Sequence, residues 1–291
     1  MYILSMLKSL FRPSNIGTII FFLLNAFLIV WIFSGGKPEN IGTMVLIYFI
    51  SVLVALSPVG EWYFSLIAGA RKMRRLDMRA KITPIFEKVY RKAKAKTPLL
   101  PNTVILKVMY DPNPNAFAVG RRTICVTEGL FDLPDDMIEG ILAHEIGHLA
   151  LHHTVIQLMI GGGNFIISTF ILILHILSTL ASGAATVGAL TSRSCSTGCL
   201  YSIFGALCAG LMWIWTKFCM VFLMWSSRAN EYEADRYAFE IGYGYELAYA
   251  LDTLGTGVPQ NTLLKALYST HPETNDRIGK LQALGVPYSR Y

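Results

Sequence analysis

Long stretches without a single formal charge dominate this sequence and limit what it can fold into. Residues 13–36 and 40–60 contain no Asp, Glu, Lys or Arg, and neither do residues 154–192. A fourth apolar stretch, residues 199–225, is interrupted only by Lys217. A bilayer core about 30 Å thick needs roughly 20 apolar residues per helix. The sequence therefore predicts a mainly α membrane protein with four transmembrane helices.

Composition agrees with a membrane protein. Charged residues make up 15 % of the chain and hydrophobic residues 53 %, against about 25 % charged residues in an average soluble domain. These values exclude a disordered chain and argue against a purely soluble one. Five cysteines are too few for a disulfide framework. A disulfide between Cys195 and Cys199, in the predicted outer loop, is left open but not favoured.

Basic residues near the span ends predict the orientation. The first span follows Lys8 and Arg12 and reads as an uncleaved anchor, not a signal peptide, because no clear cleavage site follows it. Six basic residues follow the second span: Arg71, Lys72, Arg74, Arg75, Arg79 and Lys81. By the positive-inside rule, both termini and the segment 61–153 face the cytoplasm of a cell whose inner membrane holds the chain. The net charge of +6 is thus assigned to topology and not to nucleic acid, with a lipid-headgroup site as the lesser alternative.

The predicted organisation alternates membrane and cytoplasmic parts. Two N-terminal spans occupy residues 1–60, a catalytic segment 61–153, two further spans 154–226, and a helical segment 227–291. His175 falls inside span three, where a neutral histidine bonded to a neighbouring helix is favoured over an intramembrane functional site. Lys217 marks the cytoplasmic end of span four or snorkels towards it.

The cytoplasmic parts predict an α+β domain with about three strands packed against one helix. The elements expected are a helix over 83–96, strands over 103–110, 115–119 and 123–127, a helix from residue 135 through His153, a helix over 227–241, and a last helix from Pro272.

Residues 144–148 read HEIGH on a predicted helix. His144 and His148 are four residues apart, so both imidazoles lie on one face and can reach one metal ion. Glu145, next to the first histidine, is the candidate base that activates a metal-bound water. The alternative is a solvated histidine-rich helix end, which the pattern makes less favoured.

A catalytic zinc site needs a third protein ligand, and Glu231 is the best candidate. Asp235 lies on the same helix face and can accept a hydrogen bond from the second nitrogen of a zinc histidine. Glu233 points elsewhere and is the weaker candidate. An ordinary charged helix face is the alternative for this cluster.

Two C-terminal residues are candidates for contacts with the substrate. His271 directly precedes a predicted helix and is a candidate donor to the oxyanion of the tetrahedral intermediate. Arg277 can share that task. The alternative for His271 is a turn or capping role.

Together these motifs resemble the HtpX family of membrane zinc metalloproteases, which belongs to the same broad group as the CAAX prenyl protease. The matching pieces are NAFA at 115–118, HEIGH at 144–148, EYEAD at 231–235 after Ser227 and Arg228, and the His271-Pro272 pair with a downstream Arg-Ile. The four-span layout matches too, so the resemblance extends over essentially the whole chain.

The resemblance implies one zinc ion held by His144, His148 and Glu231, with Glu145 as general base and His271 as transition-state donor. It also implies that Asn115, Ala116, Phe117 and Ala118 form a strand edge that binds substrate in extended form, a role that strand addition explains physically. The alternative for these four residues is a plain core strand. Clearance of misfolded membrane proteins, as in a stress response, is implied by the resemblance alone.

Three functions compete at this point. A membrane-embedded zinc endopeptidase acting on protein substrates at the cytoplasmic face is favoured. A CAAX-type processing protease is less favoured because that group generally has more spans. A non-catalytic zinc-binding scaffold is the third, although the site has no obvious gap. The bilayer is an expected partner and nucleic acid is not.

Overall fold

The computed structural model describes residues 8–34, 37–159, 228–255 and 274–289, with Met6 and scattered single positions within 173–214. In chain order the elements are η1 (Pro13–Asn15), α2 (Ile16–Ser34), α3 (Pro38–Ala55), α4 (Pro58–Ile67), β1 (Arg71–Lys72), α5 (Leu76–Lys96), β2 (Ile105–Met109), β3 (Ala116–Val119), β4 (Thr123–Thr127), η2 (Glu128–Asp132), α6 (Asp135–Ala150), α9 (Gly244–Gly255) and α11 (Thr274–Ala283). Residues 153–159 and 228–240 are also helical.

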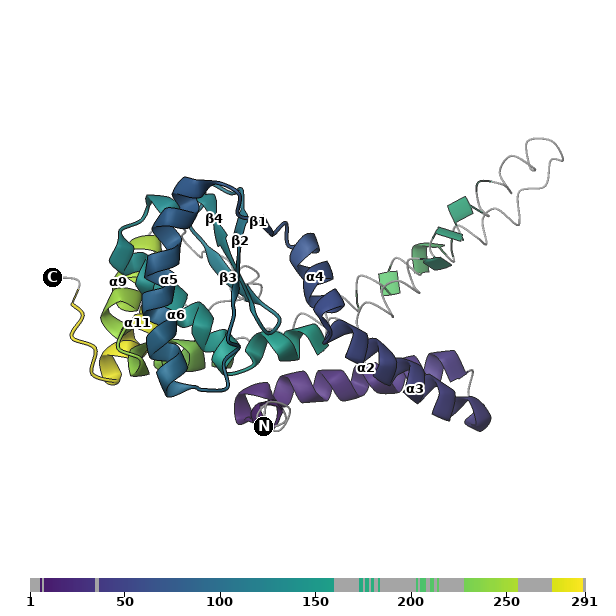
Figure 1. Ribbon diagram of the computed structural model, residues 1–291. Helices are drawn as coiled ribbons and strands as arrows, with labels where there is room; N and C mark the ends of the chain where they lie inside the picture. The colour runs from purple at the N-terminus through teal and green to yellow at the C-terminus, as the bar shows by residue number, and fades with distance from the viewer. Residues whose placement is uncertain are drawn as a thin grey trace.

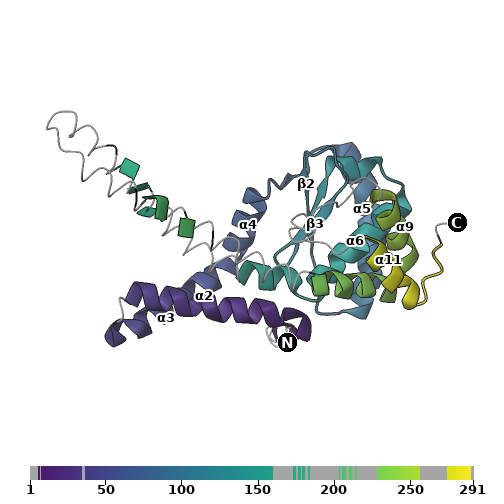
Figure 2. The same ribbon diagram turned by 180° about the vertical axis from the view of Figure 1, so that it is seen from behind.

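Two helices among the described residues, Pro13–Trp31 and Pro38–Ala55, are long and apolar enough to cross a bilayer. They lie side by side and extend from one side of the α+β domain (Figures 1 and 2). Phe27 and Trp31 are each 62 % exposed, which suits contact with lipid. The third and fourth predicted spans, with His175, Lys217, Cys195 and Cys199, lie outside the described residues, apart from single positions.

The sheet has four strands in the order β1-β2-β4-β3. β4 is the buried central strand, parallel to β2 and antiparallel to β3. The three predicted strands are confirmed. β2 and β3 are slightly shorter than the predicted 103–110 and 115–119, and β4 has the predicted bounds of 123–127. The count of about three was one too low, because β1 pairs antiparallel with β2 through two exposed basic residues that carry no hydrophobic pattern.

Helices α5 and α6 pack together, and their buried side chains share one core with the sheet. α5 begins at Leu76, not at Thr83 as predicted, so Pro84 lies inside it. A proline within a helix leaves the carbonyl four residues earlier without its partner. That residue, Ala80, is exposed, so water can bind its carbonyl, and the apolar face from Met78 to Ala93 continues through the proline.

The helix that carries HEIGH is shorter than predicted. α6 ends at Ala150, and a turn at Leu151 and His152 separates it from the helix over residues 153–159. His152 adopts a left-handed backbone with φ of 64°. Residues other than glycine take this conformation at the end of a helix only occasionally. The chain therefore changes direction before it continues towards the third predicted span.

Helix α4 connects the second apolar helix to the sheet. Its Glu61 carboxylate accepts hydrogen bonds from Thr123 Oγ1 at 2.6 Å and from the Arg122 backbone N–H at 3.2 Å. Glu61 is 9 % exposed and lies at the turn between β3 and β4. Helix α4, which follows the second apolar helix, thus fixes the start of the central strand β4 through Glu61.

Candidate metal centre

The two histidines of the HEIGH sequence lie on one face of α6. This helix is buried over most of its length, with Asp135 and Asp136 in its first turn, where the helix dipole favours negative charge. His144 Nε2 and His148 Nε2 are 3.1 Å apart. The four-residue spacing therefore places both nitrogens at one point, as predicted from the sequence.

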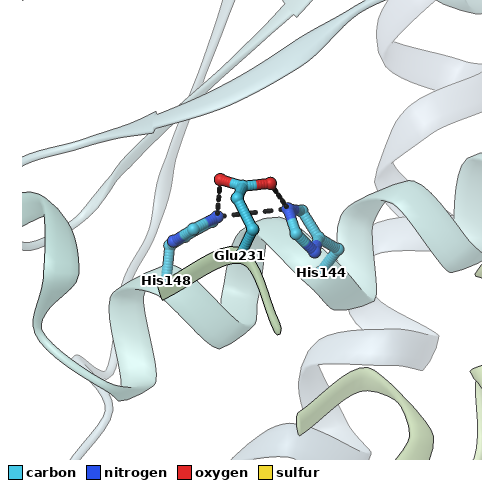
Figure 3. Close-up of side chains that lie close together, drawn as sticks. All are labelled: His144, His148 and Glu231. Carbon is cyan, nitrogen blue, oxygen red and sulfur yellow. Dashed lines mark hydrogen bonds and ion pairs between the residues drawn. The ribbon is translucent and has the colours of Figure 1, made fainter. Parts of the chain in front are cut away.

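The third candidate ligand comes from the 228–240 helix, which crosses α6 closely. The crossing occurs at Gly147, where an added Cβ would lie 3.1 Å from the Ala234 carbonyl oxygen. This close approach brings Glu231 onto the histidines. Its Oε2 lies 3.3 Å from His144 Nε2, and its Oε1 lies 3.3 Å from His148 Nε2 (Figure 3).

The three side chains offer ligand atoms that all lie within 4.8 Å of one another. Their side chains are 6 %, 12 % and 6 % exposed for His144, His148 and Glu231. Two imidazoles with one carboxylate are a known ligand set of catalytic zinc, which keeps a fourth position for water or substrate. The arrangement therefore fits a catalytic metal site.

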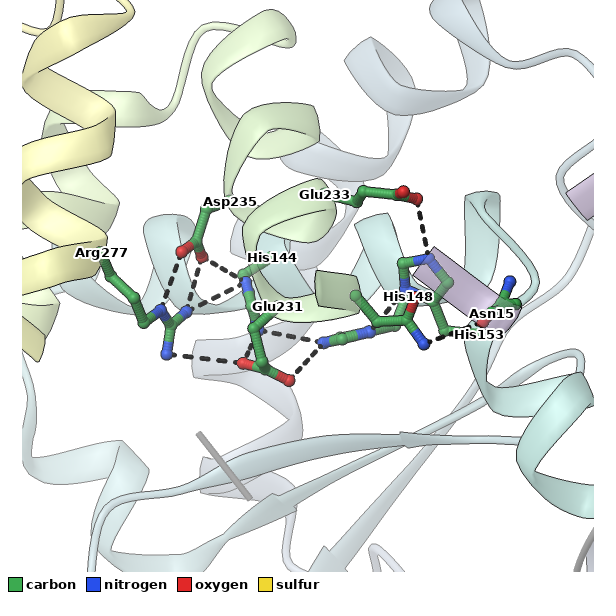
Figure 4. Close-up of polar contacts among 9 residues, drawn as sticks. Asn15, His144, His148, His153, Glu231, Glu233, Asp235 and Arg277 are labelled. Carbon is green, nitrogen blue, oxygen red and sulfur yellow. Dashed lines mark hydrogen bonds and ion pairs between the residues drawn. The ribbon is translucent and has the colours of Figure 1, made fainter. Parts of the chain in front are cut away.

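His144 is held from behind by a buried carboxylate. Its Nδ1 lies 2.8 Å from Asp235 Oδ1, and Arg277 binds the same carboxylate through Nε at 2.8 Å and Nη2 at 2.6 Å (Figure 4). Arg277 Nη2 also lies 3.3 Å from His144 Nδ1. The shorter contact identifies Asp235 as the acceptor of the Nδ1 proton, which leaves Nε2 for the metal. Arg277 Nη1 lies 3.5 Å from Glu231 Oε2.

The electrostatics of this group follow from burial and pairing. Burial alone would raise the pKa of Asp235, but the charge and hydrogen bonds of Arg277, with a hydrogen bond from His144, lower it to about 2. In the metal-free protein burial acts in the opposite direction on His144 and would lower its pKa, yet the hydrogen bonds to Asp235 and Glu231 raise it to about 10. A metal ion that binds here must displace that proton.

His148 has a different partner, which the sequence did not reveal. Its Nδ1 lies 3.1 Å from Nδ1 of His153, and His153 Nε2 lies 3.3 Å from Glu233 Oε2 (Figure 4). Arg12 Nη1 binds the same Glu233 oxygen at 3.1 Å. Burial lowers the pKa of His153 to about 4. Burial opposes ionisation of Glu233, but His153 and Arg12 help to lower its pKa to about 2.

The NAFA segment lies beside α6 as an edge strand. β3 ends the sheet and packs against α6. The Thr127 N–H donates to the Asn115 carbonyl at 2.9 Å, which fixes the alternation of the antiparallel ladder. Ala116 and Ala118 therefore point their backbone N–H and C=O groups away from β4, towards the edge of the sheet that no described strand pairs with.

Other predicted site residues are placed less fully. Glu145 follows His144 on α6 and is 7 % exposed. His271 lies outside the described residues. Arg277 is 6 % exposed and its guanidinium faces carboxylates of the site. Arg12, His153 and Glu233 join the site although no spacing rule points to them, because their contacts depend on the turn at His152 and on the packing of the N-terminal segment.

Comparison with known proteins agrees with this site. Residues 78–284 match the sequence pattern of peptidase family M48. The matched region contains α6, the 228–240 helix and α11. The chain belongs to peptidase family M48. It is therefore a protease, and the family assigns it to the metalloproteases, which work with a divalent metal.

Two relatives of this M48 peptidase extend the match beyond the family region. The protease HtpX homolog of Acaryochloris marina is 27 % identical to this chain, and the match covers 86 % of each protein. The protease HtpX homolog of Syntrophobacter fumaroxidans is 27 % identical, and the match covers 88 % of this chain and 94 % of that one. The resemblance to HtpX proteases found in the sequence is thereby confirmed, and with it a membrane metalloprotease.

A solved structure resembles the fold. The crystal structure of S. mikatae Ste24p matches with a TM-score of 0.50 and 18 % sequence identity, over 88 % of this chain. This chain spans 61 % of the length of that structure. At this level of identity the likeness is one of fold.

Proposed function

We propose that this M48 peptidase is a zinc endopeptidase that hydrolyses peptide bonds of membrane or misfolded proteins at the membrane surface. The observation that carries the proposal is the convergence of His144, His148 and Glu231 in one cluster of ligand atoms, supplied by two crossing helices. A single zinc ion fits this donor set by its chemistry, since zinc prefers imidazole nitrogen and carboxylate oxygen in threefold protein coordination.

Zinc bound here would act as a Lewis acid that makes water a nucleophile near neutral pH and polarises the scissile carbonyl. Glu145, adjacent to His144, takes the proton from the attacking water and passes it to the leaving amine. Asp235 accepts the Nδ1 proton of His144 and keeps Nε2 directed at the metal. Arg277 binds Asp235 and approaches Glu231, which favours a positioning role for it over direct contact with substrate.

Substrate binds along β3 by strand addition in this proposal. The backbone groups of Ala116 and Ala118 face the open edge, so they can pair with an extended peptide with little demand on its sequence. β3 packs against α6, the helix that carries two of the proposed metal ligands, and this contact supports a substrate-binding role for the edge of β3. His271 is the proposed donor to the oxyanion of the transition state.

The location is also a proposal. Basic residues after the second apolar helix favour a cytoplasmic active site and cytoplasmic termini in a cell inner membrane, with four spans and the metal centre split between segments 61–153 and 227–291. Substrates that are membrane proteins, and a role in quality control of membrane proteins under stress, belong to the proposal through the resemblance to the HtpX family alone.

The test is cleavage of an unfolded, unlipidated protein by the full chain purified in detergent with zinc. We expect the wild type to cut it and Glu145→Gln to bind zinc but lose at least a hundredfold in rate, within the range of general acid–base contributions. Arg236→Ala, an exposed residue paired with Glu240 away from the ligands, is the matched control and should retain activity.

Each other outcome has its own meaning. Full cleavage by a zinc-loaded Glu145→Gln variant would falsify the proposed mechanism. Cleavage confined to lipidated C-terminal peptides would favour CAAX-type processing. Zinc bound by the wild type without turnover of either substrate would favour a non-catalytic scaffold.

A further inference from the structure

The two proposed histidine ligands differ in the partner of Nδ1, the nitrogen that faces away from the metal site. His144 Nδ1 meets a carboxylate, Asp235, whereas His148 Nδ1 meets a second imidazole, His153. His153 is 1 % exposed, so its ring is shielded from any substrate that approaches from the solvent. Its contacts therefore have to be explained by what it does to His148.

The protons along this chain of contacts have one consistent arrangement. A metal on His148 Nε2 leaves the proton on Nδ1, so Nδ1 donates and His153 Nδ1 accepts. The His153 proton then lies on Nε2, which donates to Glu233 Oε2 at 3.3 Å. Arg12 Nη1 donates to the same oxygen at 3.1 Å. Every group in the chain then has a partner of the right kind.

Local backbone geometry makes the contact between the two histidines. In an uninterrupted helix, residues five apart point about 140° away from each other at 3.6 residues per turn. The left-handed turn at His152 interrupts α6 and brings His153 back against His148, with ring centroids 5.2 Å apart. The turn is thus part of the metal centre.

The segment before the first apolar helix holds the other end of this chain. In addition to the ion pair between Arg12 and Glu233, Asn15 Oδ1 accepts a hydrogen bond from Asn230 Nδ2 at 3.2 Å (Figure 4). Asn230 lies on the same helix as Glu233. Ser9 Oγ donates to the carbonyl of Leu151, in the turn itself. Asn15 and Ser9 are buried. The N-terminal segment therefore contacts both metal-bearing parts of the chain.

We propose that His153, Glu233 and Arg12 are a second support of the metal centre, in which His153 fixes the orientation and tautomer of His148 and Arg12 ties this support to the first membrane helix. His153 is in this view a positioning residue. The inference rests on the proposed function, because it takes His148 as a ligand of zinc.

The experiment measures zinc affinity, by competition with a chromophoric chelator, on the full chain in detergent. We expect His153→Leu, which removes the acceptor, to weaken zinc binding 10–100-fold, the usual effect of losing such a partner. His153→Asn keeps an acceptor and a donor and should restore most of the affinity. Arg12→Ala should weaken zinc binding severalfold. Arg236→Ala should have no effect, because Arg236 lies on the same helix as Glu233 but contacts none of His148, His153, Glu233 or Arg12.

Two further readouts separate positioning from folding. The visible absorption of the cobalt-loaded protein reports ligand geometry and should change in His153→Leu but not in Arg236→Ala. The thermal unfolding temperature of the metal-free protein should change little in His153→Asn. Loss of affinity in His153→Asn as large as in His153→Leu, with an equal fall in unfolding temperature, would show a merely structural role and overturn the inference.

The inference can also fail separately from the proposed function. Unchanged zinc affinity and an unchanged cobalt spectrum in His153→Leu would overturn the second support and leave the zinc peptidase standing. A wild type that binds no zinc would overturn both, and is recognised by the same titration.

Discussion

Gly147 lies against Ala234 where the two helices that carry the metal ligands cross. A Cβ at position 147 would meet the Ala234 carbonyl oxygen at 3.1 Å and its Cα at 3.2 Å. Small residues on both sides thus set the distance between α6 and the 228–240 helix, and with it the distance between His148 and Glu231. A second glycine of α6, Gly140, lies still closer to its neighbour, with an added Cβ 2.4 Å from the Leu247 backbone nitrogen.

These contacts predict different effects of two alanine substitutions. Gly140→Ala collides with the backbone at the start of α9, so we expect severe destabilisation, above the 1–3 kcal/mol that overpacking typically costs. Gly147→Ala needs the neighbouring helix to shift by only a few tenths of an ångström. We expect it to weaken zinc binding while the unfolding temperature of the metal-free protein falls less than in Gly140→Ala. Thermal unfolding with and without zinc, measured on both variants, checks the order. A Gly140→Ala protein as stable as wild type would contradict it.

Arg277 neutralises two buried carboxylates, and its removal should be costly. Arg277→Met leaves Asp235 buried without its bidentate partner, which predicts a loss of about 3–5 kcal/mol in unfolding free energy. Arg277→Lys keeps the charge but not the fork of two donors, so we expect an intermediate loss. Denaturant unfolding of the metal-free variants gives the values. A rise in KM alone, with stability unchanged, would instead return Arg277 to the substrate-contact role expected from the sequence.

Sequence reasoning succeeded where the signal is local. The HEIGH spacing and the four-residue step from Glu231 to Asp235 are properties of one helix each, so periodicity alone predicts that the members of each pair share a helix face. It failed where the contact depends on the path of the chain. His153 reaches His148 only because the helix breaks at His152, and nothing in the residue pattern requires a histidine to adopt a left-handed backbone there.

The fold shows the same division. Three strands follow from short runs of residues, of which 103–110 is rich in β-branched residues and 115–119 is short and apolar, whereas β1 is a two-residue strand defined only by its pairing with β2. Proline favours the first turn of a helix, and for that reason the sequence predicts a helix that starts at residue 83, just before Pro84. The helix extends back to Leu76 because the buried face continues through the proline and an exposed carbonyl bears the loss.

The burial of Cys125 predicts that alkylation of its thiol in the folded protein does not accelerate as the pH rises. The side chain is fully buried in β4, and burial raises the pKa of its thiol to about 12. The thiolate is the reactive form, so raising the pH from about 7 to about 9 increases the reactivity of an ordinary thiol but leaves Cys125 protonated. We expect alkylation of the folded protein to stay slow across this range and to accelerate with pH only in denaturant. Iodoacetamide labelling of a variant with the other cysteines replaced by serine measures this, and pH-dependent labelling of the folded form would contradict it.

Glu61 links the second membrane helix to the sheet, and its loss should loosen that link. Glu61→Ala leaves Thr123 Oγ1 and the Arg122 N–H without their acceptor, which predicts a loss of about 1–3 kcal/mol for the buried donors. Glu61→Gln retains one acceptor oxygen and should cost less. Hydrogen exchange of the β3–β4 turn reports the change locally. Equal exchange in wild type and Glu61→Ala would show that the contact does not hold the turn.

The edge of β3 allows backbone pairing with substrate to be tested one residue at a time. Phe117 lies opposite Cys125 in a position whose N–H pairs with β4, so Phe117→Pro should break the ladder and destabilise the domain. The N–H of Ala118 points to the open edge, where proline is tolerated within a sheet. Ala118→Pro should therefore keep zinc affinity and the unfolding temperature near wild type while removing one hydrogen bond to an extended peptide. We expect a severalfold to tenfold fall in kcat/KM for an unfolded protein substrate, and undiminished cleavage by a folded Ala118→Pro protein would show that substrate does not pair with this edge.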